Sequence, residues 1–247
     1  MRLAITTLAI LLAACAGQRD SVPLRIAAAS DLRFALDQVA GAYKGQNPGA
    51  ELDIVYGSSG AFYTQIQNGA PFDLYFSADA EYPRRLAREG LTVEGSEFRY
   101  AVGRIVLWSA TIEPDAETLR DPAIRKIAIA NPQHAPYGRA AEAALQSLGL
   151  YEQVRDKLVL GENVAQTLQF VQSGGADVGI VALALALAPT VHGHYWEFPL
   201  DSYPRMEQGG AILRRSTDPA AAAAFRDFIL SPEGRAILTR YGFSEGD

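Results

Sequence analysis

The sequence has little cysteine, little histidine and no excess of positive charge. Its 247 residues include one cysteine, Cys15, and three histidines, and 22 Lys and Arg face 28 Asp and Glu, for a formal net charge of −6. A single cysteine forms no intrachain disulfide. Because no basic stripe is present, nucleic acid is not an expected partner. The remaining composition is globular, with enough chain for one large domain or two smaller lobes.

Long apolar runs are missing after the first fifteen residues. MRLAITTLAILLAAC has Arg2, an apolar run and a small-residue end at Cys15, which is typical of a secretory signal and too short to span a membrane. Its end resembles a bacterial lipobox, in which the cysteine is lipidated. We therefore expect residues 1–15 to be a lipoprotein-type signal segment and residues 16–23 a tether. The alternative is an ordinary signal peptide with a chance cysteine. In both cases the protein is expected to be exported to the periplasm or cell envelope. With a lipobox, the lipid on Cys15 is expected to be its only membrane anchor.

Apolar runs alternate with segments of helical spacing in the first part of the chain. Strands are predicted at 24–29, 51–56 and 72–78, and helices at 30–46, after GSSG to about residue 67, and over 81–89. This β-α-β-α-β-α order favours a parallel sheet with helices on both faces.

The segment 98–110 is too long for one ordinary strand and is expected to run from one lobe into another. A second series follows, with strands at 126–130, 157–160, 177–185 and 206–215 and helices at 138–149, 163–173, 218–230 and 231–243. We predict two α/β lobes, the first over 24–102 and 203–247 and the second over 103–202. A single doubly wound sheet is the alternative, and the order of elements does not decide between them.

Four strand-to-helix junctions carry polar groups where open α/β sheets bind ligands. They are AAASDL with Ser30, YGSSGA with Ser58 and Ser59, ANPQHAPYGRA with Tyr137, and GENVAQ with Asn163 and Val164. Unpaired N–H groups at helix starts, joined by hydroxyls, hold an anion without Lys or Arg. Each residue alone also fits a plain role, such as a serine or asparagine that caps its helix. The prediction of an anion site therefore depends on the four junctions together.

Five segments carry a resemblance to a known family. AAASDL, YGSSGAFYTQIQNGAPFDLYFSAD, ANPQHAPYGRAA, GADVGIVAL and SPEGRAILTRYGF resemble the periplasmic molybdate-binding proteins of bacterial ABC transporters, over about residues 24–243. The resemblance implies a type II periplasmic-binding-protein fold, two α/β lobes joined by a two-segment hinge. The lobes would close on molybdate or tungstate and deliver it to a membrane permease. The resemblance implies no reaction and no cofactor, and we expect a monomer.

The resemblance also implies which residues contact the ligand. The implied contacts are the hydroxyls of Ser30 and Ser59, the loop residue Tyr137 and the N–H of Val164, with Ser58 as a further candidate.

Two positions depart from the family pattern. Ala182 stands where some members have a tyrosine, so Tyr137 is expected to supply that hydroxyl. Asp31, a further candidate for the ligand shell, stands where some members have asparagine or a small residue. A carboxylate aimed at a dianion would repel it, so we expect Asp31 to turn away and cap its helix.

Other functions remain as alternatives. A binding protein for another tetrahedral oxyanion, such as sulfate, would need similar donors, whereas hydrogen phosphate would leave its proton unpaired in a shell of donors. A secreted hydrolase using the serine-rich turn is less favoured, because YGSSGA lacks the G-x-S-x-G spacing. His192 and His194 are a weak metal signal and are expected in a surface loop. His134, beside the predicted site, is expected to be a plain loop residue.

Overall fold

The structure, a computed structural model, describes residues 22–245. The predicted signal segment, its lipidation site Cys15 and tether residues 16–21 lie outside the described residues. Within 22–245, no helix combines the length and apolar character that a membrane crossing requires.

The first sheet is built from both ends of the chain. Its strands, in spatial order, are β2 (Leu52–Gly57), β1 (Leu24–Ala29), β3 (Leu74–Ser77), β10 (Met206–Ile212) and β4 (Phe98–Gly103). Strand β1 is parallel to β2 and β3, whereas β10 is antiparallel to β3 and β4.

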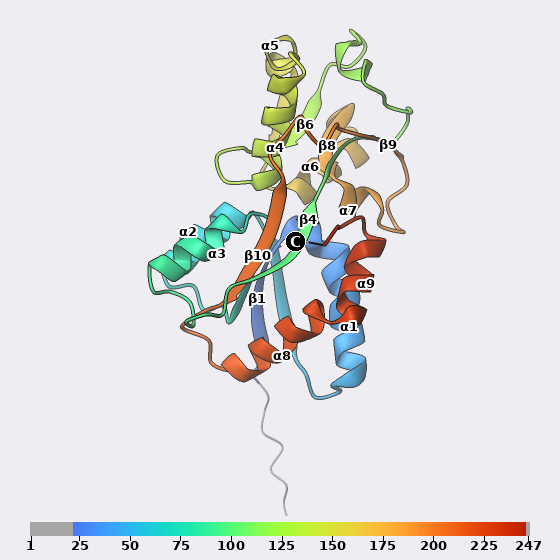
Figure 1. Cartoon of the computed structure of the whole chain (residues 1–247). Coiled ribbons are helices and arrows are strands. Elements are labelled where there is room, and N and C mark those ends of the chain that lie inside the picture. Colours follow the sequence, from blue (N-terminus) through green and yellow to red (C-terminus); the bar gives the residue numbers. More distant parts are fainter. Residues whose placement is uncertain (1–21, 246–247) are drawn as a thin grey trace, which may run out of the picture.

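Helices cover both faces of this sheet (Figure 1). They are the 3-10 turn η1 (Ser30–Leu32), α1 (Arg33–Gln46), α8 (Pro219–Leu230) and α9 (Pro232–Arg240) on one face, and α2 (Ser59–Gln67) and α3 (Glu81–Arg88) on the other. Alternate residues of β1 enter the two layers: Ala27 packs with the α2–α3 cluster, and Ile26 and Ala28 join the larger core.

The second sheet comes from the middle of the chain. Its strands, in spatial order, are β7 (Leu158–Gly161), β6 (Ile127–Ala130), β8 (Val178–Ala182), β5 (Ile105–Ser109) and β9 (His194–Glu197). Its helices are η2 (Thr118–Arg120), α4 (Pro136–Ser147), α5 (Tyr151–Val154), η3 (Arg155–Lys157), α6 (Val164–Gln172) and α7 (Leu183–Ala186). Strand β6 is parallel to β7 and β8, whereas β5 is antiparallel to β8 and β9.

The two-lobe fold is confirmed, and three details of the prediction are wrong. The predicted strand 177–185 ends at Ala182, and Leu183–Ala186 form α7. The segment 98–110 divides at Arg104 into β4 of one sheet and β5 of the other, as predicted. The first sheet is mixed rather than parallel, because β10 returns from the second lobe and runs against its neighbours. His194 begins the edge strand β9 rather than lying in a loop. The exact lobe boundaries stay a prediction.

The strand ends of both sheets face the junction between the lobes. Strands β1, β2, β6 and β7 are each followed by a turn or helix start that carries predicted site residues. Helix α4 lies so close to the end of β6 that a side chain at Gly138 would collide with the carbonyl oxygen of Ala130. Glycine at this position therefore permits the close approach. Pro136 at the first turn of α4 has a φ angle suited to a helix start.

Candidate anion-binding site

A small cavity lies where the two lobes meet. The space between its lining atoms, including the part that is open to solvent, is about 180 Å³. The predicted site residues that line it are Ser30, Asp31, Ser58 and Ser59 from the first lobe and Tyr137 and Val164 from the second. The structure thus brings together residues that lie more than a hundred positions apart. Ala182 is not among the lining residues.

Neutral donors at helix starts dominate the lining. Ser59 Oγ accepts the N–H of Ala78 at 3.0 Å, which leaves its own hydrogen to donate. Ser30 Oγ lies 3.4 Å from the backbone nitrogen of Ala165 in α6. Val164 is the first residue of α6, so its N–H has no carbonyl within the helix. None of the described residues that line the cavity is a lysine or arginine, so an anion would be held by hydroxyls, N–H groups and helix dipoles.

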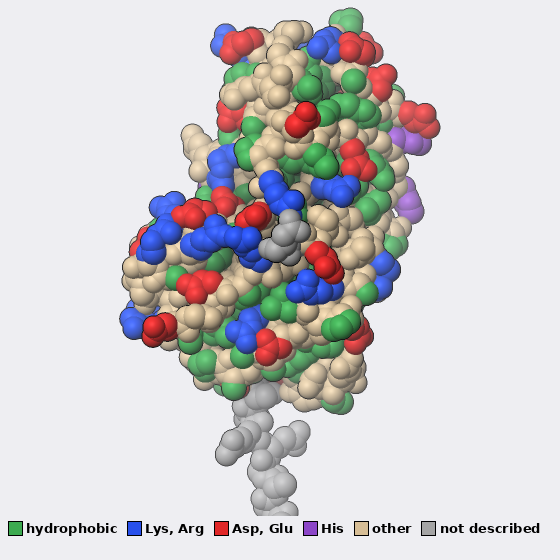
Figure 2. All heavy atoms as spheres, viewed as in Figure 1, with side chains coloured by type: hydrophobic (Ala, Val, Ile, Leu, Met, Phe, Trp, Pro, Cys, Tyr) green, Lys and Arg blue, Asp and Glu red, His purple; other side chains and the backbone are tan. Residues whose placement is uncertain are grey.

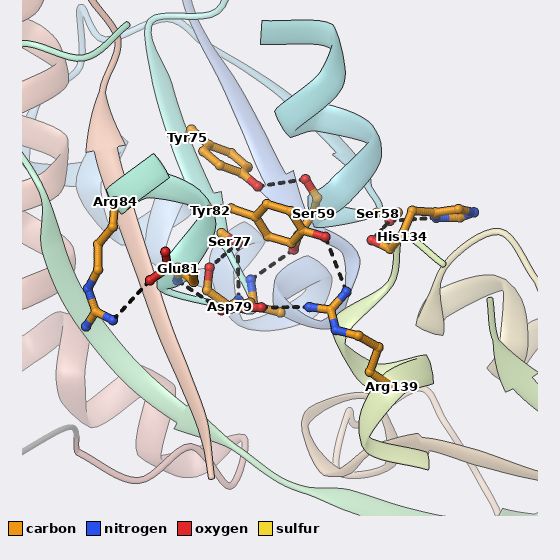
Figure 3. Close-up of polar contacts among 11 residues, drawn as sticks. Ser58, Ser59, Tyr75, Ser77, Asp79, Glu81, Tyr82, Arg84, His134 and Arg139 are labelled. Atoms are coloured by element: carbon orange, nitrogen blue, oxygen red, sulfur yellow. Dashed lines mark hydrogen bonds and ion pairs between the residues drawn. The ribbon is translucent and has the colours of Figure 1, made fainter. Parts of the chain in front are cut away.

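Ser58 serves the contact between the lobes. Its hydroxyl donates to the carbonyl oxygen of His134 at 2.7 Å and lies 2.9 Å from His134 Nδ1 (Figure 3). The N–H of Gly60 donates to the same carbonyl at 2.9 Å. A serine has one hydrogen to give, and here it goes to His134. His134, expected to be a plain loop residue, therefore joins the second lobe to the start of α2.

The expectation that Asp31 turns away from the site is wrong. Asp31 lines the cavity and is 1% exposed. Its Oδ2 accepts hydrogen bonds from the Tyr137 hydroxyl at 3.0 Å and from Gln208 Nε2 at 2.7 Å. Burial raises the pKa of Asp31 to about 6, whereas the hydrogen bonds from Gln208 and Tyr137 and the nearby backbone N–H groups of Asp31 and Leu32 lower it. The carboxylate stays inside because these neutral donors from α4 and β10 compensate part of its lost hydration.

Tyr137 therefore acts differently from the simple expectation of a free hydroxyl. Its burial, together with the nearby Asp31, raises its pKa well above the usual range, so the phenol stays protonated. Its single hydrogen is donated to Asp31, across the lobe boundary. The contact therefore joins α4 of the second lobe to the Asp31 carboxyl of the first.

Gln208 is a site residue that the sequence reasoning missed. It is fully buried, and its Nε2 also lies 3.1 Å from the Tyr137 hydroxyl. The available signal was a polar residue within β10, a strand that is mostly buried. Gly103, at the end of β4, leaves room for this cluster, because a Cβ there would lie 2.6 Å from Gln208 Nε2 and would collide with the Tyr137 hydroxyl.

A second polar contact joins the lobes beside the cavity. Arg139 of α4 reaches the loop after β3, where its guanidinium lies 2.6 Å from Asp79 Oδ2 and 3.2 Å from the Tyr82 hydroxyl (Figure 3). Arg84 points the other way and pairs with acids of its own lobe. Figure 2 shows basic and acidic side chains mixed over this face, with no large patch of one sign.

The described part of the chain offers no metal centre made of side chains. Within residues 22–245, no group of three or more His, Cys, Asp or Glu side chains is placed to hold a metal ion. His194 Nδ1 lies 3.8 Å from Glu113 Oε1, as an isolated pair.

Comparisons with known proteins define the class. The model of a family described as bacterial extracellular solute-binding protein matches residues 24–244. The chain belongs to this family.

Within that class, the chain is similar to proteins named for molybdate. It is 38% identical over 237 residues to the molybdate-binding protein ModA of Azotobacter vinelandii, covering 94% of this chain and 93% of that one. It is 39% identical over 206 residues to ModA of Rhodobacter capsulatus, covering 82% and 81%. The solved periplasmic molybdate-binding protein of Azotobacter vinelandii superposes with a TM-score of 0.85 at 35% identity, covering 91% of this chain and all of that one. The resemblance found in the sequence is thereby confirmed.

Proposed function

We propose that this protein captures molybdate, and also tungstate, in the cavity between its lobes. The observation that carries the proposal is the convergence of Ser30, Ser59, Tyr137 and Val164 on one small cavity. The names of the similar proteins support the choice of ligand.

The donor set suits an oxyanion that is captured and later released. The chain is net acidic, so long-range steering does not attract a dianion. Short hydrogen bonds from the Ser30 and Ser59 hydroxyls and the Val164 N–H hold it instead. Sulfate carries the same charge as molybdate but is smaller, so cavity size decides between them. The hydrolase alternative requires a serine that gives its hydrogen to a base. Ser59 Oγ accepts the N–H of Ala78, and the Ser58 hydroxyl donates to the carbonyl oxygen of His134 rather than to the imidazole.

Binding is proposed to favour the closed arrangement of the lobes. Each lobe contributes only part of the ligand shell, so the anion has greater affinity for the closed form and shifts the equilibrium toward it. The contacts of His134 with Ser58 and of Arg139 with Asp79 belong to this closed form. Two stretches of chain act as the hinge, near 102–103 and near 202–203.

The cellular setting follows from the same proposal. The protein is exported to the periplasm or cell envelope as a monomer, is tethered through a lipid on Cys15, and passes its anion to the permease of an ABC transporter. It performs no reaction and needs no cofactor.

The test is equilibrium dialysis against molybdate with a matched pair of serine variants. Ser59 and Ser96 are both buried, and each Oγ accepts a backbone N–H, from Ala78 at 3.0 Å and from Ile212 at 3.2 Å. Ser59→Ala removes a proposed ligand donor, so affinity should fall about 10- to 150-fold, as loss of a hydrogen bond to a charged group implies. Ser96→Ala should bind as the wild type does. Equal binding by all three proteins would refute the role of Ser59, and absence of binding by the wild type would refute the function.

A further inference from the structure

Two buried oxygen atoms at the site have no hydrogen-bond partner among residues 22–245. They are Asp31 Oδ1 and Gln208 Oε1. They belong to side chains already joined to each other, because Gln208 Nε2 donates to Asp31 Oδ2 at 2.7 Å. Both orphaned atoms are acceptors when Asp31 is ionised, so neither satisfies the other. A buried acceptor without a donor is unfavourable.

One proton changes this arrangement. Asp31 Oδ2 is held by Tyr137 and Gln208, so Oδ1 is the oxygen left to carry a proton. Once protonated, Oδ1 donates its hydrogen to Gln208 Oε1 or to an oxygen of a bound anion. The carboxyl group would then be neutral, and the repulsion between a carboxylate and a dianion in the same cavity would disappear.

Among residues 22–245, the surroundings of Asp31 offer no better placed titratable side chain to take this role. The titratable side chains that face it are the phenols of Tyr137 from α4 and Tyr100 from β4, and burial raises the pKa of both. Helices α6 and α7 also pack against η1 and carry no titratable side chain. Arg33 and Asp37 of α1 are exposed.

We propose that the site takes up one proton with each dianion that it binds, and that this proton resides on Asp31. The inference rests on the proposed function and adds a pH dependence to it. The pKa of about 6 for the buried carboxyl supports it, because a dianion placed nearby raises that value further. Above this pH the free protein has an ionised Asp31, and binding draws a proton from solvent.

The experiment is calorimetric titration of the protein with molybdate, in pairs of buffers that differ in ionisation enthalpy, from pH 5 to pH 8. At pH 8 the wild type should take up close to one proton per anion, and at pH 5 close to none. Its Kd should rise by about tenfold per pH unit above the pKa of Asp31. Asp31→Asn keeps a neutral donor, so it should bind without proton uptake and with a Kd independent of pH. At pH 8 it should bind up to about 100-fold more tightly than the wild type.

Controls separate this inference from the function on which it rests. Asp53→Asn makes the same change at an exposed residue of β2 and should behave as the wild type. Molybdate binding by the wild type without proton uptake would overturn the inference and leave the function intact. Hydrogen phosphate bound by the wild type without proton exchange, and lost in Asp31→Asn, would show Asp31 acting as an acceptor and would also overturn it. No molybdate binding by either protein would overturn the proposed function, and this inference with it.

Discussion

Replacing Arg139 with alanine should weaken anion binding without touching the cavity. Arg139 joins α4 of the second lobe to Asp79 and Tyr82 of the first, at 2.6 Å and 3.2 Å, and it is not one of the residues that line the cavity. If the contact belongs to the closed form, as proposed above, its loss shifts the equilibrium toward the open form and raises the Kd for the anion.

The size of the effect follows from the exposure of the pair. The side chains of Arg139 and Asp79 are 40% and 34% exposed, so solvent screens their attraction and about 0.5–1 kcal/mol is appropriate. The guanidinium also lies 5.6 Å from the centre of the Tyr82 ring, which adds about 0.5 kcal/mol. The sum of about 1–1.5 kcal/mol corresponds to a Kd about 5- to 12-fold higher.

The assay is calorimetric titration with molybdate at low and high salt. Arg84→Ala is the matched control, because Arg84 pairs with Glu81 and Glu207 of its own lobe. The control should bind as the wild type does, and the effect of Arg139→Ala should shrink at high salt. An unchanged Kd for Arg139→Ala, or an equal loss in the control, would refute the reasoning.

Three further predictions concern Gly60, Tyr137 and Asp31. Gly60→Ala places a Cβ 2.5 Å from the His134 carbonyl oxygen and should weaken molybdate binding by more than tenfold. Gly41 has open space around it, so Gly41→Ala should bind as the wild type does. Equal molybdate affinities of the two variants in equilibrium dialysis would contradict the proposed contact between the lobes. Tyr137→Phe removes a donor to the Asp31 carboxyl, a loss of about 1–3 kcal/mol, and should raise the Kd about 5- to 150-fold; an unchanged Kd in titration would count against the contact. Asp31→Asn should change how stability depends on pH. Because the pKa of Asp31 is raised in the folded wild type, the folded protein binds more protons than the unfolded chain between about pH 4 and 6. The stability of the wild type therefore falls as pH rises through that window. Urea unfolding should find the variant up to about 3 kcal/mol more stable relative to the wild type at pH 7 than at pH 4, and a difference independent of pH would contradict this.

The sequence predicts most of the fold because its elements are locally encoded. Apolar runs mark the strands, and Ser30, Ser59 and Val164 begin the helical segments that follow them. The length of 98–110 indicates the crossing between lobes. The direction of β10 is not encoded locally, since a strand of this composition pairs equally well in either direction.

The site was predicted less completely than the fold. The junction residues share one cavity, as the resemblance implied. The orientation of Asp31 depends on Gln208, 177 positions away, and the role of Ser58 depends on His134, 76 positions away. Such pairs form only when the lobes meet, so neither helix-capping preference nor local spacing predicts them.

The central claim is that the cavity between the lobes holds a tetrahedral dianion chosen by size. The most direct measurement is calorimetric titration of the purified protein with molybdate, tungstate, sulfate and phosphate under identical conditions. The account predicts tight one-to-one binding of molybdate and tungstate, with no heat of binding for sulfate and phosphate. No binding of molybdate and tungstate, or binding of sulfate with the same affinity as molybdate, would contradict it.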